Sequence, residues 1–293
     1  MLDMCWARPS APIMRLSFSV RSHVGFARKN NEDNFCCDGT ILTPNEREAP
    51  FAASGIVNTP CIFAVCDGMG GESDGEFASF ATVTALVEHS EKIKSAAALN
   101  KNEIDKAVQD FVFSANKILC DAMLVRSVRM GTTLALAVVT DDTIYPYNLG
   151  DSRIYARSDG EFRQFSEDHS LAEQKVKMGI ITKEQARVDR DRNRLTRHLG
   201  IFEDEMTVMA AVLDPMPLDV TGRILLCSDG LTDMVTDARI DEILLASSGA
   251  DTAAERLLDE ALKNGGRDNV TCIVIDIEEK QTNDNMEWYI WPI

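Results

Sequence analysis

The sequence predicts an α+β fold in which mainly antiparallel β-sheets are covered by helices. Short segments with strand character recur along the chain, and several are rich in Val, Ile and Thr and end in turns that contain Gly. Helical stretches separate groups of strands, without the strict strand–helix alternation of a βαβ protein. A parallel sheet is therefore disfavoured, because parallel neighbours need a crossover between successive strands.

The expected strands are short apolar segments at residues 16–20, 61–66, 133–139, 143–149, 152–157, 223–227 and 270–277. Helical spacing of apolar residues occurs at residues 76–94, 102–125 and 252–263, and Gly265 is expected to end the last of these helices. Residues 43–60 contain three prolines and are expected to form a surface loop. Residues 278–293 form a polar stretch with the aromatic end Trp288-Tyr289-Ile290-Trp291, which is expected to dock on the domain or on a partner.

The chain of 293 residues is long enough for one large domain or two ordinary ones, and it is strongly acidic. Its 47 acidic and 30 basic residues give a formal net charge of −17, which disfavours nucleic acid and anionic membranes as partners. The same charge repels phosphorylated substrates. A phosphate site would therefore need its own local positive field, and bound metal ions would supply one.

Neither of the longest apolar runs, residues 61–66 and 134–139, is long enough to span a bilayer. Residues 1–14 lack the continuous apolar stretch of a signal peptide, so the expected location is the cytoplasm. The eight cysteines include no C-x-x-C pair and no Cys/His cluster at zinc-finger spacing. Reduced thiols are therefore expected.

Five short polar motifs could carry the chemistry. They are Arg28-Lys29-Asn30-Asn31-Glu32-Asp33-Asn34, Asp67-Gly68-Met69-Gly70-Gly71, Gly150-Asp151-Ser152-Arg153, Ser228-Asp229-Gly230-Leu231 and Gly266-Arg267-Asp268-Asn269. Each has an ordinary alternative, because Asp-Gly is a common turn pair and the last motif could simply mark the exit from a helix.

The positions of the acidic residues favour a shared site. Asp67 and Asp229 each follow an apolar run, Asp268 lies just before another, and Asp151 lies between two. A carboxylate at the mouth of a buried strand is costly unless it is paired or binds a cation. No His or Cys accompanies these residues, and a ligand set made only of oxygen atoms selects Mg²⁺ or Mn²⁺ over Zn²⁺ or Cu²⁺.

Residues 166–210 differ in character from the rest of the chain. Two short segments with helical spacing, 171–178 and 183–188, lead into a run in which arginines alternate with acids. The arginines are Arg187, Arg190, Arg192, Arg194 and Arg197. The run is either a solvated charged segment or a mobile flap beside an anionic site, and the sequence leaves both open.

The five motifs, in this order, resemble those of the metal-dependent Ser/Thr protein phosphatases (type 2C), and Asp-Gly-Met-Gly-Gly is typical of the bacterial branch. Supporting matches are Glu167-Asp168-His169-Ser170-Leu171 and Leu195-Thr196-Arg197-His198-Leu199-Gly200. The resemblance covers residues 15–277. It implies a central sandwich of two mainly antiparallel sheets flanked by pairs of helices (α-β-β-α), with residues 1–14 as an extension, 166–210 as a flap and 278–293 as a tail.

The resemblance also implies a role for each acidic residue at a pair of Mn²⁺ or Mg²⁺ ions. Asp67 would bridge the two ions, and the Gly68 carbonyl would add a ligand to one of them. Asp229 and Asp268 would complete the shell of the other ion. Either member of the Glu32–Asp33 pair would hold the second ion, directly or through water.

Two further assignments follow from the same resemblance. Arg28, four residues before Glu32, would bind the substrate phosphate. Asp151, with Asp229, matches the site of a third, looser metal ion found in bacterial relatives.

The implied reaction is attack on phosphoserine or phosphothreonine by a water that bridges the two ions. The implied partners are phosphorylated proteins, among them a Ser/Thr kinase and its substrates, and a monomer is expected. One departure concerns Met69, which stands where eukaryotic members have a His that is thought to protonate the leaving group. A metal-bound water, His169 or His198 could take that role.

Two other functions are compatible with the motifs. A degenerate phosphatase domain that only binds a partner would be expected to have lost metal carboxylates, whereas Asp67, Asp229 and Asp268 are all present. A switch that acts on one dedicated phosphoprotein would be expected to carry an attached sensor domain.

Overall fold

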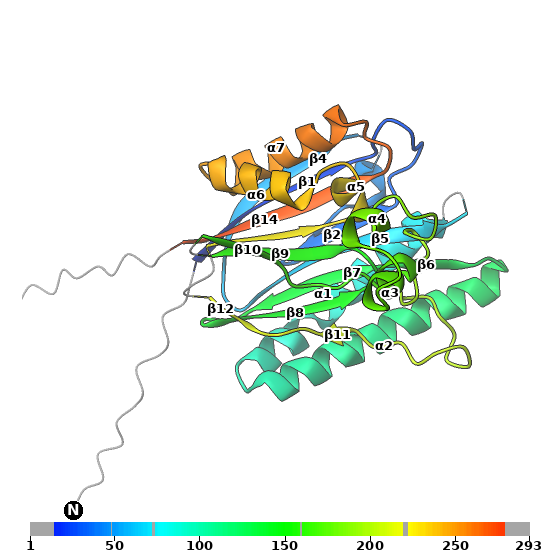
Figure 1. Ribbon diagram of the computed structural model, residues 1–293. Helices are drawn as coiled ribbons and strands as arrows, with labels where there is room; N and C mark the ends of the chain where they lie inside the picture. Colours follow the sequence, from blue (N-terminus) through cyan, green and yellow to red (C-terminus); the bar gives the residue numbers. More distant parts are fainter. Residues whose placement is uncertain (1–14, 48, 72–73, 159, 219–221, 279–293) are drawn as a thin grey trace, which may run out of the picture.

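The computed structural model describes residues 15–47, 49–71, 74–158, 160–218 and 222–278. Two β-sheets face each other, and helices cover the outer face of each sheet, so that the molecule has four layers (Figure 1). The predicted α-β-β-α sandwich is confirmed. The expected extension 1–14 and tail 278–293 lie outside the described residues, except for Glu278, which is the last residue of β14 (Val270–Glu278).

The first sheet has six strands, and each neighbouring pair is antiparallel. Its strands in spatial order are β10 (Glu161–Gln164), β9 (Arg153–Ser158), β13 (Arg223–Cys227), β14 (Val270–Glu278), β1 (Arg15–His23) and β4 (Phe51–Asn58). Strand β14, which comes last in the sequence, lies in the middle of this sheet and pairs with β1 along nine positions. The two ends of the domain are thereby joined.

The second sheet is also antiparallel. Its strands in spatial order are β11 (Ala211–Val212), β8 (Thr143–Leu149), β7 (Leu134–Val139), β5 (Cys61–Gly70), β2 (Asp33–Cys37) and β3 (Thr40–Ile41). Two short strands lie off this path: β12 (Met216–Pro217) pairs with β8, and β6 (Met130–Thr132) pairs with β5.

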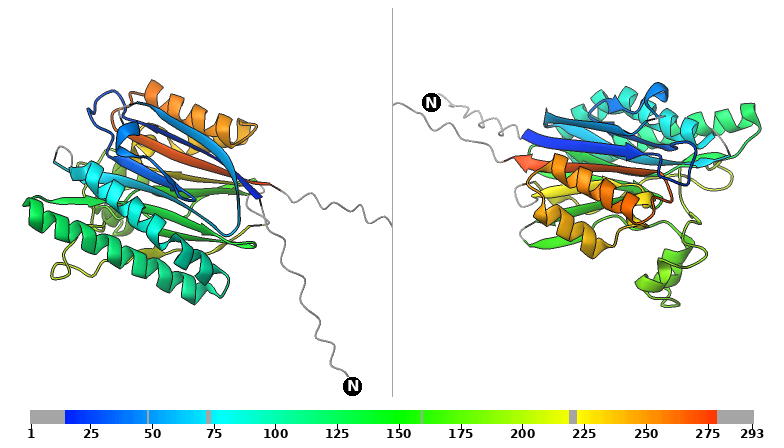
Figure 2. Two further views of the ribbon diagram at one scale, coloured as in Figure 1. Left: turned by 180° about the vertical axis from the view of Figure 1, so that it is seen from behind. Right: turned by 90° about the horizontal axis from the view of Figure 1, so that it is seen from above.

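The helices of the described ranges fall into four groups. The long helices α1 (Asp74–Ala97) and α2 (Lys101–Arg126) pack together over the second sheet, and α6 (Asp237–Ala246) and α7 (Ala250–Lys263) cover the first. The short helix α5 (Asp229–Thr232) directly follows β13. The helices α3 (Leu171–Lys177) and α4 (Lys183–Ala186) belong to a segment that projects from the sandwich (Figure 2, right).

Three hydrophobic cores hold these layers together. The core between the sheets is built from alternate residues of facing strands, among them Phe18, Phe35, Phe63, Leu226 and Ile273. A second core lies beneath α1 and α2, and a third lies beneath α6 and α7. Strands such as β5 and β13 are buried on both faces, which explains their continuous apolar sequences.

The prediction of a surface loop at residues 43–60 is wrong. It contains a 3₁₀ turn (Pro44–Glu46) and then β4, which pairs with β1 from Phe51 to Asn58 and forms an edge of the first sheet. Small residues such as Ala52, Ala53 and Gly55 have low strand propensity, so the segment gave little local signal. Pairing with β1 and burial of its inner face determine this strand.

The other sequence predictions of local structure are largely confirmed. Every expected strand and helix is present, with ends that differ by a few residues. The helix α6 and the short strands β2, β3, β6 and β10 to β12 were not predicted, because they are brief or carry mixed polar residues. All cysteines in the described ranges are free thiols, and their reduced state stays a prediction.

The packing of α2 gives a direct test of the second core. Phe111 is fully buried in it, whereas Phe113 on the opposite side of the same helix is 57% exposed. We expect Phe111→Ala to lower the free energy of unfolding by about 3–5 kcal/mol, because the truncation leaves a cavity. Phe113→Ala is the matched control and should change it by less than about 1 kcal/mol. Equal effects in urea unfolding would contradict this packing.

Candidate metal centre

The antiparallel topology brings the five sequence motifs to one end of the sandwich. Asp67 lies near the C-terminal end of β5, and Asp33 begins β2, the neighbour of β5. Strand β13 leads into Asp229, while Asp268 lies two residues before the start of β14, the antiparallel partner of β13. Asp151 lies in the turn between β8 and β9. Because ends and starts of antiparallel strands alternate along an edge, residues far apart in the sequence meet here.

Asp33 and Asp67 are the centre of this cluster. They are paired residues in the register of β2 and β5. Asp33 is fully buried, and its Oδ2 accepts a hydrogen bond of 2.7 Å from the Ser228 hydroxyl. Its Oδ1 is buried and has no hydrogen-bond partner in the described part of the chain. An unpaired buried carboxylate oxygen is costly, so this atom is a natural ligand for a cation.

Burial and like charges raise the pKa of these carboxyl groups. Desolvation, followed by repulsion from Asp229, Asp33, Asp151 and Asp268, raises the pKa of Asp67 well above its ordinary value. Desolvation and repulsion from neighbouring carboxylates also raise the pKa of Asp229 well above its ordinary value. Desolvation raises the pKa of Asp33 and of Asp151 to about 7. The carboxyl groups are therefore close enough to repel one another when ionised.

The backbone around Asp67 is fixed on several sides. The Thr133 amide and the Thr132 hydroxyl both donate to the Asp67 carbonyl at 2.9 Å, and the Asp67 amide donates to the Thr133 hydroxyl at 2.9 Å. Gly68 packs so closely on the start of α1 that a Cβ there would lie 2.0 Å from the Gly75 carbonyl oxygen. Only glycine fits at this point.

Glu32 lies between this backbone and α1. Its side chain is so close to Gly75, in the first turn of α1, that a Cβ on that glycine would lie 2.6 Å from Glu32 Oε1. A carboxylate is stabilised at a helix N-terminus by the helix dipole. Desolvation nevertheless raises the pKa of Glu32 to about 7. The Glu32 amide donates to the Asn269 side chain at 2.7 Å, which connects the motif that contains Glu32 to the residue after Asp268.

Arg28 is half-exposed at the rim of the cluster and forms an ion pair of 2.7 Å with Asp268. This hydrogen bond is the main cause that raises the Arg28 pKa, with smaller contributions from Glu32 and Asp67. The predicted phosphate ligand and a predicted metal ligand therefore contact each other. Asp268 is itself held by the Asn269 amide, which donates to its Oδ1 at 2.9 Å.

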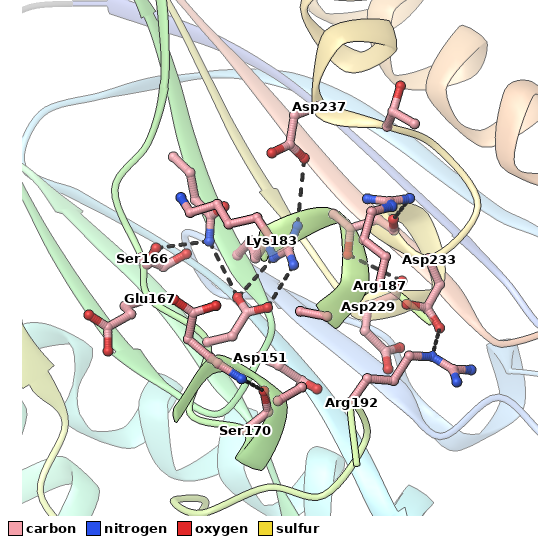
Figure 3. A pocket seen from close by; sticks show the side chains of 18 of the residues that line it. Asp151, Ser166, Glu167, Ser170, Lys183, Arg187, Arg192, Asp229, Asp233 and Asp237 are labelled. Carbon is pink, nitrogen blue, oxygen red and sulfur yellow. Dashed lines mark hydrogen bonds and ion pairs between the residues drawn. The ribbon is translucent and has the colours of Figure 1, made fainter. Parts of the chain in front are cut away.

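The projecting segment brings two of its arginines to the site. Arg187 and Arg192 line a cavity of about 620 Å³ together with Asp151, Asp229 and Asp233 (Figure 3). The other flap arginines behave differently. Arg190 and Arg194 pair with Asp191 of the same segment. Of the two interpretations of the arginine run, the solvated one fits Arg190, whose side chain is 91% exposed, and the site-facing one fits Arg187 and Arg192.

The two histidines considered as proton donors both lie against backbone groups. His169 is buried, its Nδ1 accepts a hydrogen bond of 3.1 Å from the Gly150 amide, and desolvation lowers its pKa to about 4. His198 Nδ1 lies 2.8 Å from the Leu199 carbonyl oxygen, and the ring packs on Gly131. Both rings therefore fix the start and end of the flap. Cys66, just before Asp67, is a fully buried strand thiol, and burial raises its pKa well above the ordinary value.

The sequence motifs gave no sign of Arg47. This buried residue of the segment before β4 donates to the Asn31 carbonyl at 2.7 Å, to the Glu76 carbonyl at 3.2 Å and to the Ser79 hydroxyl at 3.4 Å. Its charge attracts Glu32 and Asp33, although desolvation lowers its own pKa. Arg47 thus joins the motif that contains Glu32 to the first turn of α1.

The donors present suit hard divalent cations. They are carboxylate and carbonyl oxygens without His or Cys, and the unpaired Oδ1 of Asp33 and the repelling carboxyl groups would be stabilised by positive charge. Within the part of the chain that the structure describes, no three His, Cys, Asp or Glu side chains already converge on one point as the ligands of an ion do. The cluster is therefore recognised from the register of its strands and from the repulsion between its carboxyl groups.

Comparisons with known proteins give a consistent result. A family model described as Protein phosphatase 2C matches residues 50–264. The serine/threonine phosphatase stp of Listeria innocua is 32% identical over 258 residues, which are 87% of this chain and 94% of that protein. The serine/threonine protein phosphatase PstP of Mycobacterium tuberculosis is 32% identical over 264 residues, which are 89% of this chain and 45% of that protein.

Solved structures agree with the sequence relatives. The structure of PstP from Mycobacterium tuberculosis has a TM-score of 0.71 and 30% identity, and covers 90% of this chain and 100% of its own. The catalytic domain of PstP in complex with two manganese ions has a TM-score of 0.70, with 28% identity over 91% of this chain and 100% of its own. The S. agalactiae serine/threonine phosphatase has a TM-score of 0.75 and 26% identity, and covers 90% of this chain and 100% of its own.

The raised carboxyl pKa values predict how the stability of the metal-free protein depends on pH. Between about pH 4 and pH 7, the folded chain keeps protons on Glu32, Asp33 and Asp151 that the unfolded chain releases, so stability falls as pH rises. His169, with its lowered pKa of about 4, and His23, whose pKa burial also lowers, contribute in the opposite sense but are fewer groups than the carboxyls. In excess chelator we expect a higher Tm at pH 5.5 than at pH 8. The free energy of unfolding should be larger at pH 5.5 by on the order of a few kcal/mol.

Added Mn²⁺ should reduce or reverse that difference, because it binds the ionised carboxylates. Thermal unfolding followed by circular dichroism at both pH values, with chelator and with Mn²⁺, measures both effects. A Tm in chelator that rises steadily from pH 5.5 to pH 8 would contradict the assignment.

Arg47 gives a second prediction. Arg47→Met keeps the buried apolar stem but removes three hydrogen bonds to Asn31, Glu76 and Ser79. We expect the free energy of unfolding in urea to fall by about 2–4 kcal/mol, because buried carbonyl groups lose a charged donor. Arg190→Met, at a side chain that is 91% exposed, is the control and should change it by less than about 0.5 kcal/mol. A neutral Arg47→Met would show that the contacts are incidental.

Proposed function

The chain belongs to the protein phosphatase 2C family, and from that premise we propose which of its residues carry out the reaction. The chain is a metal-dependent protein serine/threonine phosphatase that uses Mn²⁺ or Mg²⁺. The observation that carries the residue assignment is that five motif aspartates lie at the same end of the sandwich and repel one another. They are Asp33, Asp67, Asp151, Asp229 and Asp268.

In this proposal Asp67 would be a ligand shared by the two ions, with the Gly68 carbonyl as a further ligand. Asp229 and Asp268 would hold one ion. The central place of Asp67 supports this role, since each of the other motif aspartates contributes to its raised pKa. The ions, when bound, supply an activated water and offset negative charge on the phosphoryl oxygens.

Glu32 or Asp33 would hold the second ion, directly or through water, and Asp151 with Asp229 would form the third, looser site. The buried Oδ1 of Asp33, which has no partner among the described residues, supports its role. Glu32 is held nearby through Asn269 and the start of α1. Asp151 lines the same cavity as Asp229.

Arg28 binds the substrate phosphate. Its guanidinium is half-exposed and contacts Asp268 through Nη2, which leaves its other donors free to face solvent. An ion held by the Asp268 carboxylate would weaken its attraction for Arg28, and the guanidinium would then be able to bind two phosphoryl oxygens in a bidentate fork. This residue therefore positions the phosphoryl group against the metal centre.

The leaving-group proton does not come from Met69, which has no exchangeable proton. His169 is also unsuitable, because it is buried, its pKa is lowered to about 4 and its Nδ1 accepts from the Gly150 amide. His198 is held against Leu199 and Gly131. We propose that water in the metal centre supplies this proton.

The substrates are phosphorylated proteins, and we propose that they include a Ser/Thr kinase and the proteins which that kinase phosphorylates, in the cytoplasm of a bacterium. Residues 15–277 form the catalytic domain in this proposal, and the protein acts as a monomer. No helix in the described ranges combines the length and the apolar character needed to cross a membrane.

The test is hydrolysis of p-nitrophenyl phosphate and of a phosphothreonine peptide, with Mn²⁺ or with chelator, by the wild type and Asp67→Asn. We expect turnover only with metal. Asp67→Asn should lower kcat by more than about a hundredfold, because it removes the charge of a ligand shared by both ions.

Asp110→Asn is the matched control, since Asp110 is exposed on α2 and pairs with Lys92. It should have wild-type activity. Turnover without metal, or full activity of Asp67→Asn, would contradict the mechanism. Metal binding without any turnover would indicate a domain that only binds partners.

A further inference from the structure

A second cavity, of about 500 Å³, adjoins the proposed phosphate site and is lined by four arginines. Arg28 lies on one wall, and the flap residues Arg187 and Arg192 lie on another. Arg267 completes the set, and Asp233 and Asp268 are the acidic residues that line the cavity. Four guanidinium groups against two carboxylates leave an excess of positive charge here, in a chain whose formal net charge is −17. We call this cavity the arginine cleft.

The arginines of the cleft have donors to spare. Arg187 uses Nη2 to donate to the Thr232 carbonyl at 2.9 Å, and Arg192 approaches Asp233 through Nε at 3.5 Å. Arg267 is exposed and forms no hydrogen bond or ion pair within the described ranges. A guanidinium has five N–H donors, so most donors of these residues are available to a ligand.

The positions of these side chains are set by the same backbone that builds the site. Arg267 lies between Gly266, which has a φ of +49° and accepts a hydrogen bond of 2.7 Å from the Phe26 amide, and Asp268. Arg187 anchors the flap to α5 through Thr232, directly after Asp229 and its neighbours. The cleft is therefore attached to the metal centre on both walls.

We propose that the arginine cleft binds a second anionic group of the substrate, next to the phosphoresidue that is hydrolysed. The preferred substrates are then phosphopeptides with a carboxylate or a further phosphate close to the scissile position. This inference rests on the proposed function, because it takes Arg28 and the carboxylate cluster as the place of the scissile phosphate.

The charge balance supports this substrate class. The bulk charge of the chain and the carboxylates of the centre repel an acidic peptide segment at contact. Guanidinium groups are suited to carboxylate and phosphate because they offer paired donors in a plane. Salt screens interactions between charges that are more than about 8 Å apart at physiological ionic strength. Only arginines close to the bound peptide can therefore offset that repulsion.

The experiment compares three phosphothreonine peptides of equal length, with Mn²⁺. Their flanking position carries alanine, glutamate, or a phosphonate analogue of phosphoserine that cannot be hydrolysed. For the wild type we expect kcat/KM to be higher with either anionic flank than with alanine, on the order of tenfold, and higher salt should reduce that ratio. The glutamate and phosphonate arms show which anion the cleft prefers.

The variants Arg187→Gln, Arg192→Gln and Arg267→Gln, and the triple variant, should bring the ratio of anionic to alanine peptides toward one, mainly through KM. Arg190→Gln is the matched control, because this flap arginine has the same charge but pairs with Asp191 outside the cleft. It should keep the wild-type ratio.

Hydrolysis of p-nitrophenyl phosphate separates the two hypotheses. No metal-dependent turnover of any substrate would refute the proposed function. Turnover of p-nitrophenyl phosphate and the alanine peptide without an anionic preference would refute only the arginine cleft. An equal loss of preference in Arg190→Gln and the cleft variants would also refute it, since bulk charge would then explain the effect.

Discussion

Carboxylates that repel one another lie together at one end of the β-sandwich, and this end of the molecule is built to hold them there. The register of β2 and β5 places Asp33 opposite Asp67, and β13 and β14 bring Asp229 and Asp268 alongside. Burial and mutual repulsion oppose ionisation of these groups. None of these strands can slip along its neighbour to relieve the repulsion. A slip of one residue would move the apolar side chains of a strand to the opposite face of the sheet, away from the cores against which they pack. Bound divalent ions would offset the repulsion between these carboxylates, so that the same arrangement would serve as a binding site.

Close approach of backbone gives that arrangement its rigidity. A Cβ at Gly68 would meet the Gly75 carbonyl oxygen at 2.0 Å, and one at Gly230 would meet the Asn269 carbonyl oxygen at 1.9 Å. The Asn269 side chain donates to the carbonyls of Val24 and Asn30 at 2.9 Å each and accepts from the Glu32 amide. Segments from both sheets and from α1 and α5 are thereby fixed to one another with little room for side chains. The carboxylates inherit their positions from this packed backbone, as a precise metal site requires.

The sequence predicted the parts of this architecture that repeat a local pattern. Continuous apolar runs located β5, β13 and β14, and the acidic residue at the end of each run located the site. What it could not predict depends on tertiary contacts. Strand β4 contains Ala52, Ala53 and Gly55 and is stabilised by pairing with β1, so its residues resembled a loop. Arg47 looked like any charged loop residue, and only the fold buries it against Asn31 and Glu76. The flap arginines were visible as a group, but which of them face the cavity depends on how the flap lies.

The division between a rigid centre and a projecting flap has a consequence for selectivity. In the proposed function the metal centre would contact the phosphoryl group, which is common to all substrates, so it would not by itself distinguish one phosphoprotein from another. Discrimination requires groups that touch the flanking residues, and the flap residues Arg187 and Arg192 are placed to do so. Because these side chains lie on short helices and loops outside the three cores, they can be exchanged at little cost in stability. Substrate preference in this fold can therefore change at the flap while the carboxylates and the backbone that holds them stay the same.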